Sequence, residues 1–130
     1  MKSIMQAWNK KQLQRIQFNM EKKFQIAGVT FEGRQDILEK LNQEYHEIGF
    51  RRIVELVPDP ENKYDSNAVK VQVNLDGNVK QLGYVPKTIN SQILELVKNE
   101  KIKWAKLSDI GRVQESGVLG GTITYEEKEK

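Results

Sequence analysis

The sequence is poor in the residues that build disulfides and metal sites, because its 130 residues include no cysteine, one histidine and three prolines. Without cysteine the chain forms no disulfide and offers neither a thiolate ligand nor a cysteine nucleophile. One histidine disfavours a zinc site, since zinc draws most of its ligands from cysteine and histidine. No apolar run approaches the ~20 residues needed to cross a bilayer, and no signal peptide is recognisable. These absences predict a single cytoplasmic domain with no cofactor and no membrane contact.

Common catalytic and nucleotide-binding motifs are missing too, among them the Walker loop, GxGxxG, HExxH and GxSxG. Residues 117–121 are glycine-rich, but no Lys-Ser/Thr pair or helix follows, so we interpret them as a bulged strand. Asp59, Glu61 and Asp65 fail the calcium-loop pattern, which requires glycine at its sixth position and an acid at its twelfth. The sequence therefore predicts that the protein is not an enzyme. A magnesium nuclease using these three acids is the weakest alternative.

Positive charge is concentrated at the N-terminus. Residues 1–23 carry six cations and one acid, a net charge of +5, whereas residues 24–125 and 126–130 each carry a net −1. We expect a basic arm over residues 1–22, a nearly neutral domain over 23–125 and a charged tail over 126–130. Basic arms are common in nucleic-acid-binding proteins, but a neutral body argues against broad duplex binding. Ile4, Trp8, Ile16 and Met20 fall near one helical face, so a helical arm and a frayed arm both remain open.

Hydrophobic periodicity and turn residues predict six strands and two helices. Apolar residues recur every three or four positions from Gln35 to Ile48, which indicates a helix that Gly49 ends. A second helix is expected after Thr88, with the threonine side chain as its cap. The pair Asp76-Gly77 favours a tight hairpin. The expected strands are 23–31, 50–57, 68–74, 79–85, 102–107 and 118–125.

The order of these elements is strand, helix, three strands, helix, two strands. Short strands outnumber helices and hairpins dominate, which favours antiparallel sheet. The predicted fold class is mainly β with two α-helices, arranged as a small antiparallel β-barrel or highly curved sheet.

Residues 57–69 are the most informative stretch of the chain. Pro58 and Pro60 stiffen the backbone and remove two donors, while Asn, Asp and Ser side chains can hydrogen-bond the nearby backbone. Tyr64 offers a flat surface for stacking, and Asp65 offers an acceptor for a hydroxyl. From composition alone, a self-bonded connector and a binding loop are equally favoured.

Three segments resemble the HIRAN domain, a module of helicase-like fork-remodelling proteins that also occurs as a small stand-alone protein in bacteria and phages. Residues 26–35 (IAGVTFEGRQ) are similar to the bacterial form of the family's opening strand. Residues 56–71 (LVPDPENKYDSNAVKV) are close to its PxNPYDxNAV signature, and residues 82–87 (LGYVPK) to its GYVP segment. The segments keep their order within residues 24–98, and the middle one is specific.

The resemblance implies an OB-like β-barrel with two helices that binds single-stranded DNA at a free 3′-hydroxyl end, in the service of DNA repair. The family positions that contact the terminal nucleotide correspond to Tyr64 and Asp65. Asn62 corresponds to a further polar contact in the same loop. The other implied DNA contacts are the aromatic after the first strand, a position that is histidine in the family, and a phosphate-facing lysine, namely Phe31, Tyr84 and Lys87.

The chain departs from the eukaryotic members at two places. They follow their first strand with a basic residue and two aromatics, where this chain has Thr30, Phe31 and Glu32, so one ring and one positive charge are missing. Their C-terminal aromatic has no counterpart among residues 116–121. Two functions stand side by side: a DNA-end binder, and a protein-interaction module in which the loop is only structural. A helicase or a nuclease is the kind of protein partner in question.

Overall fold

The computed structural model describes residues 21–49 and 51–129. The element order confirms the prediction of strand, helix, three strands, helix and two strands, and with it the mainly β fold with two helices. The predictions for residues 1–20 and for Phe50 lie outside the described residues. The elements are β1 (Glu21–Gln25), α2 (Arg34–Ile48), β2 (Glu55–Pro58), β3 (Val69–Leu75), β4 (Asn78–Tyr84), α3 (Asn90–Lys98), β5 (Ile102–Arg112) and β6 (Leu119–Glu127).

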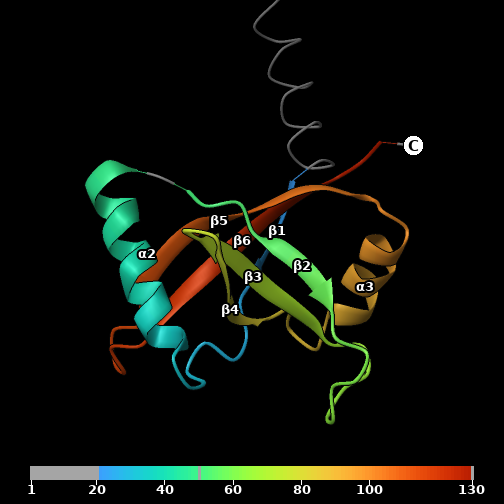
Figure 1. The fold of residues 1–130 in the computed structure, drawn as a ribbon, viewed down its shortest axis with the longest axis horizontal. Coiled ribbons are helices and arrows are strands. Elements are labelled where there is room, and N and C mark those ends of the chain that lie inside the picture. The colour runs from blue at the N-terminus through green and yellow to red at the C-terminus, as the bar shows by residue number, and fades with distance from the viewer. Residues whose placement is uncertain (1–20, 50, 130) are drawn as a thin grey trace, which may run out of the picture.

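The strands form two three-stranded antiparallel sheets, ordered β1-β6-β5 and β2-β3-β4. In Figure 1 the sheets lie between the two helices, with α2 on one side and α3 on the other. Isolated bridges join the sheets at Ala27 with Tyr84 and at Ile53 with Lys106. The two sheets do not close into one continuous cylinder, so the term barrel describes this fold only loosely.

The β3–β4 hairpin follows directly from its sequence. Val69, Val71 and Val73 alternate along β3 and are at most 2% exposed, as the period of two in a strand requires. Asp76 and Gly77 both have positive φ, at 54° and 86°, which is the geometry of a type I′ turn. The predicted hairpin and its buried face are confirmed.

One hydrophobic core unites both sheets and both helices. Removing such side chains from water stabilises the fold by about 1.5–3 kcal/mol each. Its largest fully buried members come from α2, β4, α3 and β6, and they are Leu38, Leu82, Ile93, Leu119 and Ile123.

The first strand ends at Gln25, six residues earlier than expected. The chain turns at Gly28, which has a φ of 70°, and residues 29–33 form turns rather than extended backbone. An alternating pattern cannot reveal this end, because the pattern continues through the turn. The early end places Phe31 in an exposed turn, where its side chain is 67% exposed.

Thr88 does not cap the second helix. The N-cap of α3 is Ile89, which makes no side-chain capping bond. A turn that starts at the carbonyl of Pro86 holds the amide of Ile89 instead, at 3.1 Å. The helix therefore begins later than a threonine cap would require.

The end of the β1–β6 pair that contains Glu21 and Glu126 extends beyond the expected domain limits. β1 begins at Glu21, two residues inside the expected arm, and β6 runs to Glu127, two residues inside the expected tail. The Nζ of Lys22 lies 2.7 Å from a carboxylate oxygen of Glu127, and Glu126 is paired with Lys103 at 3.5 Å. Charge alone predicted a basic arm and a charged tail, whereas pairing across strands makes these residues part of the sheet.

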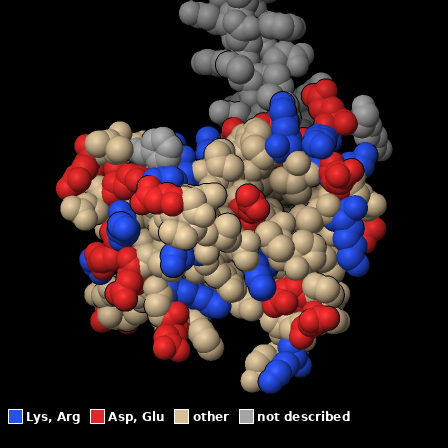
Figure 2. Space-filling model, in the orientation of Figure 1, with Lys and Arg blue, Asp and Glu red and all other residues tan. Residues whose placement is uncertain are grey.

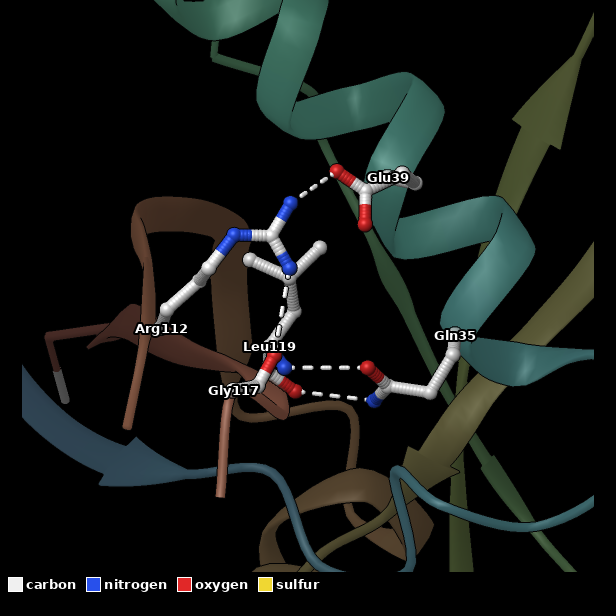
Figure 3. A network of polar contacts seen from close by, with 5 residues as sticks. All are labelled: Gln35, Glu39, Arg112, Gly117 and Leu119. Carbon is white, nitrogen blue, oxygen red and sulfur yellow. Dashed lines mark hydrogen bonds and ion pairs between the residues drawn. The ribbon is translucent and has the colours of Figure 1, made fainter. Parts of the chain in front are cut away.

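The side chain of Gln35 joins the start of α2 to β6 by hydrogen bonds, as Figure 3 shows. The Gln35 amide nitrogen donates to the carbonyls of Leu119 and Val29, both at 2.9 Å. Its oxygen accepts from the backbone amide of Leu119, also at 2.9 Å. Gln35 thus pairs with Leu119 as a neighbouring strand would. Beside it, Arg112 bridges the Gly117 carbonyl and the Glu39 carboxylate.

Gly83 permits the closest approach between the two sheets. A Cβ atom added there would lie 2.2 Å from the carbonyl oxygen of Ala27 and 2.6 Å from a methyl of Ile26. The next residue, Tyr84, exchanges both backbone hydrogen bonds with Ala27, at 2.8 and 2.9 Å. The bridge that places Tyr84 beside the first strand therefore depends on the absence of a side chain at Gly83.

We expect Gly83→Ala to lower the free energy of unfolding by about 1–3 kcal/mol, because the added methyl overlaps backbone that cannot move freely. Gly120→Ala is the matched control, since a Cβ at Gly120 meets no atom within 4 Å, and its effect should stay within about 0.5 kcal/mol. Urea unfolding of both variants measures the difference. Equal midpoints for the two variants would contradict this account of the bridge.

Candidate nucleic-acid interface

The loop that follows β2 is a closed, self-bonded structure, and Figure 1 shows it projecting from the body of the protein. The amide of Asp59 donates to the carbonyl of Ala68 at 2.9 Å, which ties the two ends of the loop together. Two turns lie between them, closed by the amide of Asn62 on Asp59 and that of Ala68 on Asp65, each at 3.1 Å. Backbone bonds thus fix a short loop that belongs to neither helix nor sheet.

Asn62 is the central side chain of this loop. Its oxygen accepts from the backbone amides of Tyr64 and Asp65, at 2.9 and 3.1 Å. Its nitrogen donates to a carboxylate oxygen of Asp59 at 3.1 Å and to the hydroxyl of Tyr84 at 3.3 Å. These four bonds use the two donors and two acceptor sites of an asparagine amide. Asn62 therefore orients the loop and links it to β4.

Both carboxylate oxygens of Asp65 are held within the protein. One accepts from the backbone amide of Asn67 at 2.9 Å, and the other accepts from the buried side chain of Asn90 at 2.6 Å. These two hydrogen bonds, with the nearby charge of Lys87, keep the pKa of the Asp65 carboxyl below its ordinary value. An ionised carboxylate has about four lone-pair sites, so Asp65 retains acceptor capacity for a ligand.

Tyr64 stands beyond this framework with 90% of its surface exposed. Its backbone is fixed by Asn62, and its ring extends into solvent. An exposed ring on a fixed backbone is suited to stacking, since little backbone freedom is lost when a base binds.

Arg34 lies between two aromatic rings, an arrangement that the sequence did not suggest. Its guanidinium carbon is 4.9 Å from the ring centroid of Phe31 and 5.3 Å from that of Tyr84. One guanidinium nitrogen donates to the carbonyl of Gly28 at 2.7 Å. Such cation–π contacts contribute about 0.5–2 kcal/mol. Arg34 restores a positive charge beside Phe31, where comparison with the eukaryotic pattern had suggested that one was missing.

The structure joins most of the predicted residues through direct contacts. Phe31 touches Arg34, Arg34 touches Tyr84, and the Tyr84 hydroxyl meets Asn62. Asn62 in turn holds the backbone of the two remaining loop residues, and the charge of Lys87 acts on one of them. The missed members of this interface are one cation, one buried amide and one acid, namely Arg34, Asn90 and Asp59.

A signal for Arg34 was present in the sequence. It follows Phe31 by only three residues, and the amide of Arg34 closes the turn between them on the carbonyl of Phe31 at 3.0 Å. No comparable signal exists for Asn90. It is 25 residues from Asp65 and buried, and a helix pattern alone does not say which loop its first turn meets.

Charges of both signs are interspersed over the face drawn in Figure 2, with no wide field of one sign. This mixture agrees with the nearly neutral body expected from composition. Within residues 21–49 and 51–129, no group of three His, Asp or Glu side chains is placed to hold a metal ion. No helix in the described part of the chain is long and apolar enough to cross a membrane.

Two comparisons with known proteins bear on this interface. The sequence model of the HIRAN domain matches residues 21–116. Among solved structures, the fold is similar to the crystal structure of the HIRAN domain of human HLTF, with a TM-score of 0.54 and 20% sequence identity. That match covers 85% of this chain and 78% of the other. At this identity the likeness shows the fold alone. A search of curated proteins found no match.

We expect Asp65→Asn to lower the free energy of unfolding near neutral pH. The difference in this free energy between variant and wild type should become smaller as the pH falls below about 4. The pKa of Asp65 is lower in the folded state than in the unfolded chain. Its carboxylate therefore contributes stability above the unfolded pKa, and that contribution is lost as the pH falls through the folded pKa. Urea unfolding at several pH values between about 3 and 7 measures this difference.

Asp109→Asn is the control for this titration. Asp109 is exposed, and within the described ranges its carboxylate accepts no hydrogen bond. The account of the hydrogen bonds to Asp65 would be wrong if the loss of unfolding free energy in Asp65→Asn did not change with pH. It would also be wrong if Asp109→Asn showed an equal change with pH.

Proposed function

The chain belongs to the HIRAN domain family, whose members are nucleic-acid-binding modules, and on that premise we propose that it binds single-stranded DNA at a free 3′-hydroxyl end. The proposed activity is binding without catalysis. The proposed contacts are made by three aromatics, an acid, an amide and a lysine, which are Phe31, Asn62, Tyr64, Asp65, Tyr84 and Lys87.

The observation that supports the proposal best is the pairing of an exposed ring with an ionised carboxylate. Tyr64 is 90% exposed, and the neighbouring Asp65 has a lowered pKa. A terminal hydroxyl can donate to the carboxylate, whereas a 3′-phosphate or a continuing phosphodiester would bring negative charge towards it. Repulsion of that kind selects strand ends without reading the sequence of bases.

The aromatic pair around Arg34 adds a second element. The guanidinium is held by one bond to the Gly28 carbonyl and by two ring faces, while its other donors remain available to a phosphate or a base. Stacking on exposed rings contributes about 1–3 kcal/mol per base. The proposal therefore assigns end selection to Asp65 and affinity to Tyr64, Phe31 and Arg34.

Binding to a short oligonucleotide with a free 3′-hydroxyl should be at least about tenfold tighter than binding to the same strand with a 3′-phosphate, a difference of about 1.4 kcal/mol. Asp65→Asn should reduce this preference, because the repelling charge is removed. Tyr64→Ala should weaken binding to both strands by about 1–3 kcal/mol. Fluorescence titration of the wild type and the two variants with each of the two strands measures these affinities.

Controls for the titration are Asp76→Asn and Val79→Ala, two exposed positions in or beside the β3–β4 turn. Both should leave the affinities and the end preference unchanged. Equal affinities of the wild type for the two strands would refute the recognition of 3′ ends.

A protein-interaction module is the second candidate, favoured by one observation. The amide of Asn62 and both oxygens of Asp65 are bonded within the protein, so the loop has a structural role whatever it binds. In that case no affinity for single strands should be measurable, and a helicase or nuclease should be retained in a salt-insensitive manner.

The basic arm yields a separate prediction. Four cations and no acid lie within residues 1–20, and removing those residues leaves β1 complete. If all four contact phosphates, the slope of log affinity against log salt should become less steep by up to about 2.8, at about 0.7 per contact on single strands. A slope that does not change in the truncated protein would exclude arm–phosphate contacts.

A further inference from the structure

A polar hollow of about 650 Å³ lies on the outer face of the β1-β6-β5 sheet. It is separate from the loop of residues 59–68 that follows β2, which we call the signature loop. The end of α2 contributes Tyr45 to its wall, and the segment after that helix contributes Arg51. Two carboxylates and three cations line it, which leaves a net positive charge. Its principal cations and hydroxyl groups are Lys23, Arg51, Lys106, Ser108, Thr122 and Thr124.

Two lysines face each other across the middle strand of this sheet. Lys23 on β1 and Lys106 on β5 are both in register with Thr124 on β6. Two strand spacings separate them, about 10 Å, so their flexible side chains can reach one anion placed above Thr124. Neither lysine forms an ion pair within residues 21–49 and 51–129.

Aromatic rings orient the cations on two sides of the hollow. The ammonium group of Lys106 lies 4.9 Å from the Trp104 ring centroid. The guanidinium of Arg51 lies 5.5 Å from that of Tyr45 and donates to its hydroxyl at 3.4 Å. Contacts of this kind leave the charge unneutralised while they limit the motion of the side chain. Within the described ranges, none of the three cations of the hollow forms an ion pair with a carboxylate.

The floor of the hollow is a fixed row of hydroxyl groups. The Thr124 hydroxyl donates to that of Ser108 at 2.6 Å, and Ser108 donates to the carbonyl of Thr122 at 3.2 Å. Thr124 is 3% exposed. A polar floor of this kind accommodates hydrated phosphate better than it accommodates an apolar side chain.

This hollow lies on the same face as Tyr84. Along β1 and its continuation, Phe24 and Ile26 are buried, so Lys23, Gln25 and Ala27 face the opposite way. Ala27 pairs with Tyr84 in an antiparallel bridge, and bridged partners project to the same side. About 13 Å of strand separates Lys23 from Ala27, at 3.3 Å per residue. A few nucleotides of single strand would span that distance.

We propose that the hollow between Lys23 and Lys106 binds the phosphodiester backbone of a single strand whose end lies at Tyr64 and Tyr84. This inference rests on the proposed function, because it extends the path of the same strand. The acids Glu21 and Asp109 at the hollow favour one or two phosphate contacts over a broad, tight site. The hollow thus sets the length of strand that the protein covers, while the loop recognises the end.

The test compares oligothymidines of about four and about twelve nucleotides, both with free 3′-hydroxyl ends, two lengths within the roughly 4–16 nucleotides that one OB fold covers. The wild type should bind the longer strand about tenfold more tightly. The double variant Lys23→Gln with Lys106→Gln should lose most of that gain and keep its affinity for the shorter strand. Its salt slope on the longer strand should become less steep by about 1.4, the value for two lost phosphate contacts.

A matched control removes two charges elsewhere, by Lys40→Gln on α2 with Lys98→Gln on α3. This control should still bind the longer strand about tenfold more tightly than the shorter one. Retained affinity for the short strand shows that the lysine variant is folded. If the variant Lys23→Gln with Lys106→Gln still bound the longer strand about tenfold more tightly than the shorter one, the hollow would not be a backbone site. The proposal of end recognition would be unaffected by that result. Absence of short-strand binding in the wild type, with lysine-dependent binding of the long strand, would support the hollow and refute the end site.

Discussion

The close contact between Gly83 and the backbone at Ala27 is the constraint on which the rest of the structure depends. It lets two separate three-stranded sheets approach until Tyr84 and Ala27 share both backbone hydrogen bonds. That bridge carries Tyr84 to the edge of the first sheet, beside Arg34 and within reach of the signature loop. The bridge thus brings Tyr84 of one sheet beside Phe31 and Arg34, which follow the first strand of the other sheet.

A second constraint is the requirement that polar groups of an irregular loop find partners. The loop has no ladder to satisfy its amides, and the side chain of Asn62 supplies the acceptor for two of them. Asp65 is satisfied by a donor from the start of α3. The same bonds that stabilise the fold therefore hold Tyr64 in its exposed position, so much of the ordering cost is met before any ligand binds. Under the proposed function, these shared hydrogen bonds would couple the stability of the loop to the binding of a strand.

Particular residues show how far sequence reasoning extends to the site. The prolines and the Asn, Asp and Ser side chains of residues 57–69 predict a loop. A tyrosine within such a polar loop is expected to be exposed. Arg34 was overlooked because it lies just before the helix predicted from Gln35, and a single cation at that place belongs to no recognisable pattern. Phe31 was placed in a strand that ends six residues earlier, since the alternation of apolar residues continues past the turn at Gly28.

The sequence by itself determined the order of the elements, the β3–β4 hairpin and the helix that Gly49 ends. Each of these depends on interactions between residues close in the chain, which periodicity and turn chemistry record. Only the tertiary structure decided that the sheets remain open, that Arg34 lies between Phe31 and Tyr84, and that Asn90 meets Asp65. Each of these depends on segments that lie far apart in the chain, and no local pattern encodes which segments meet.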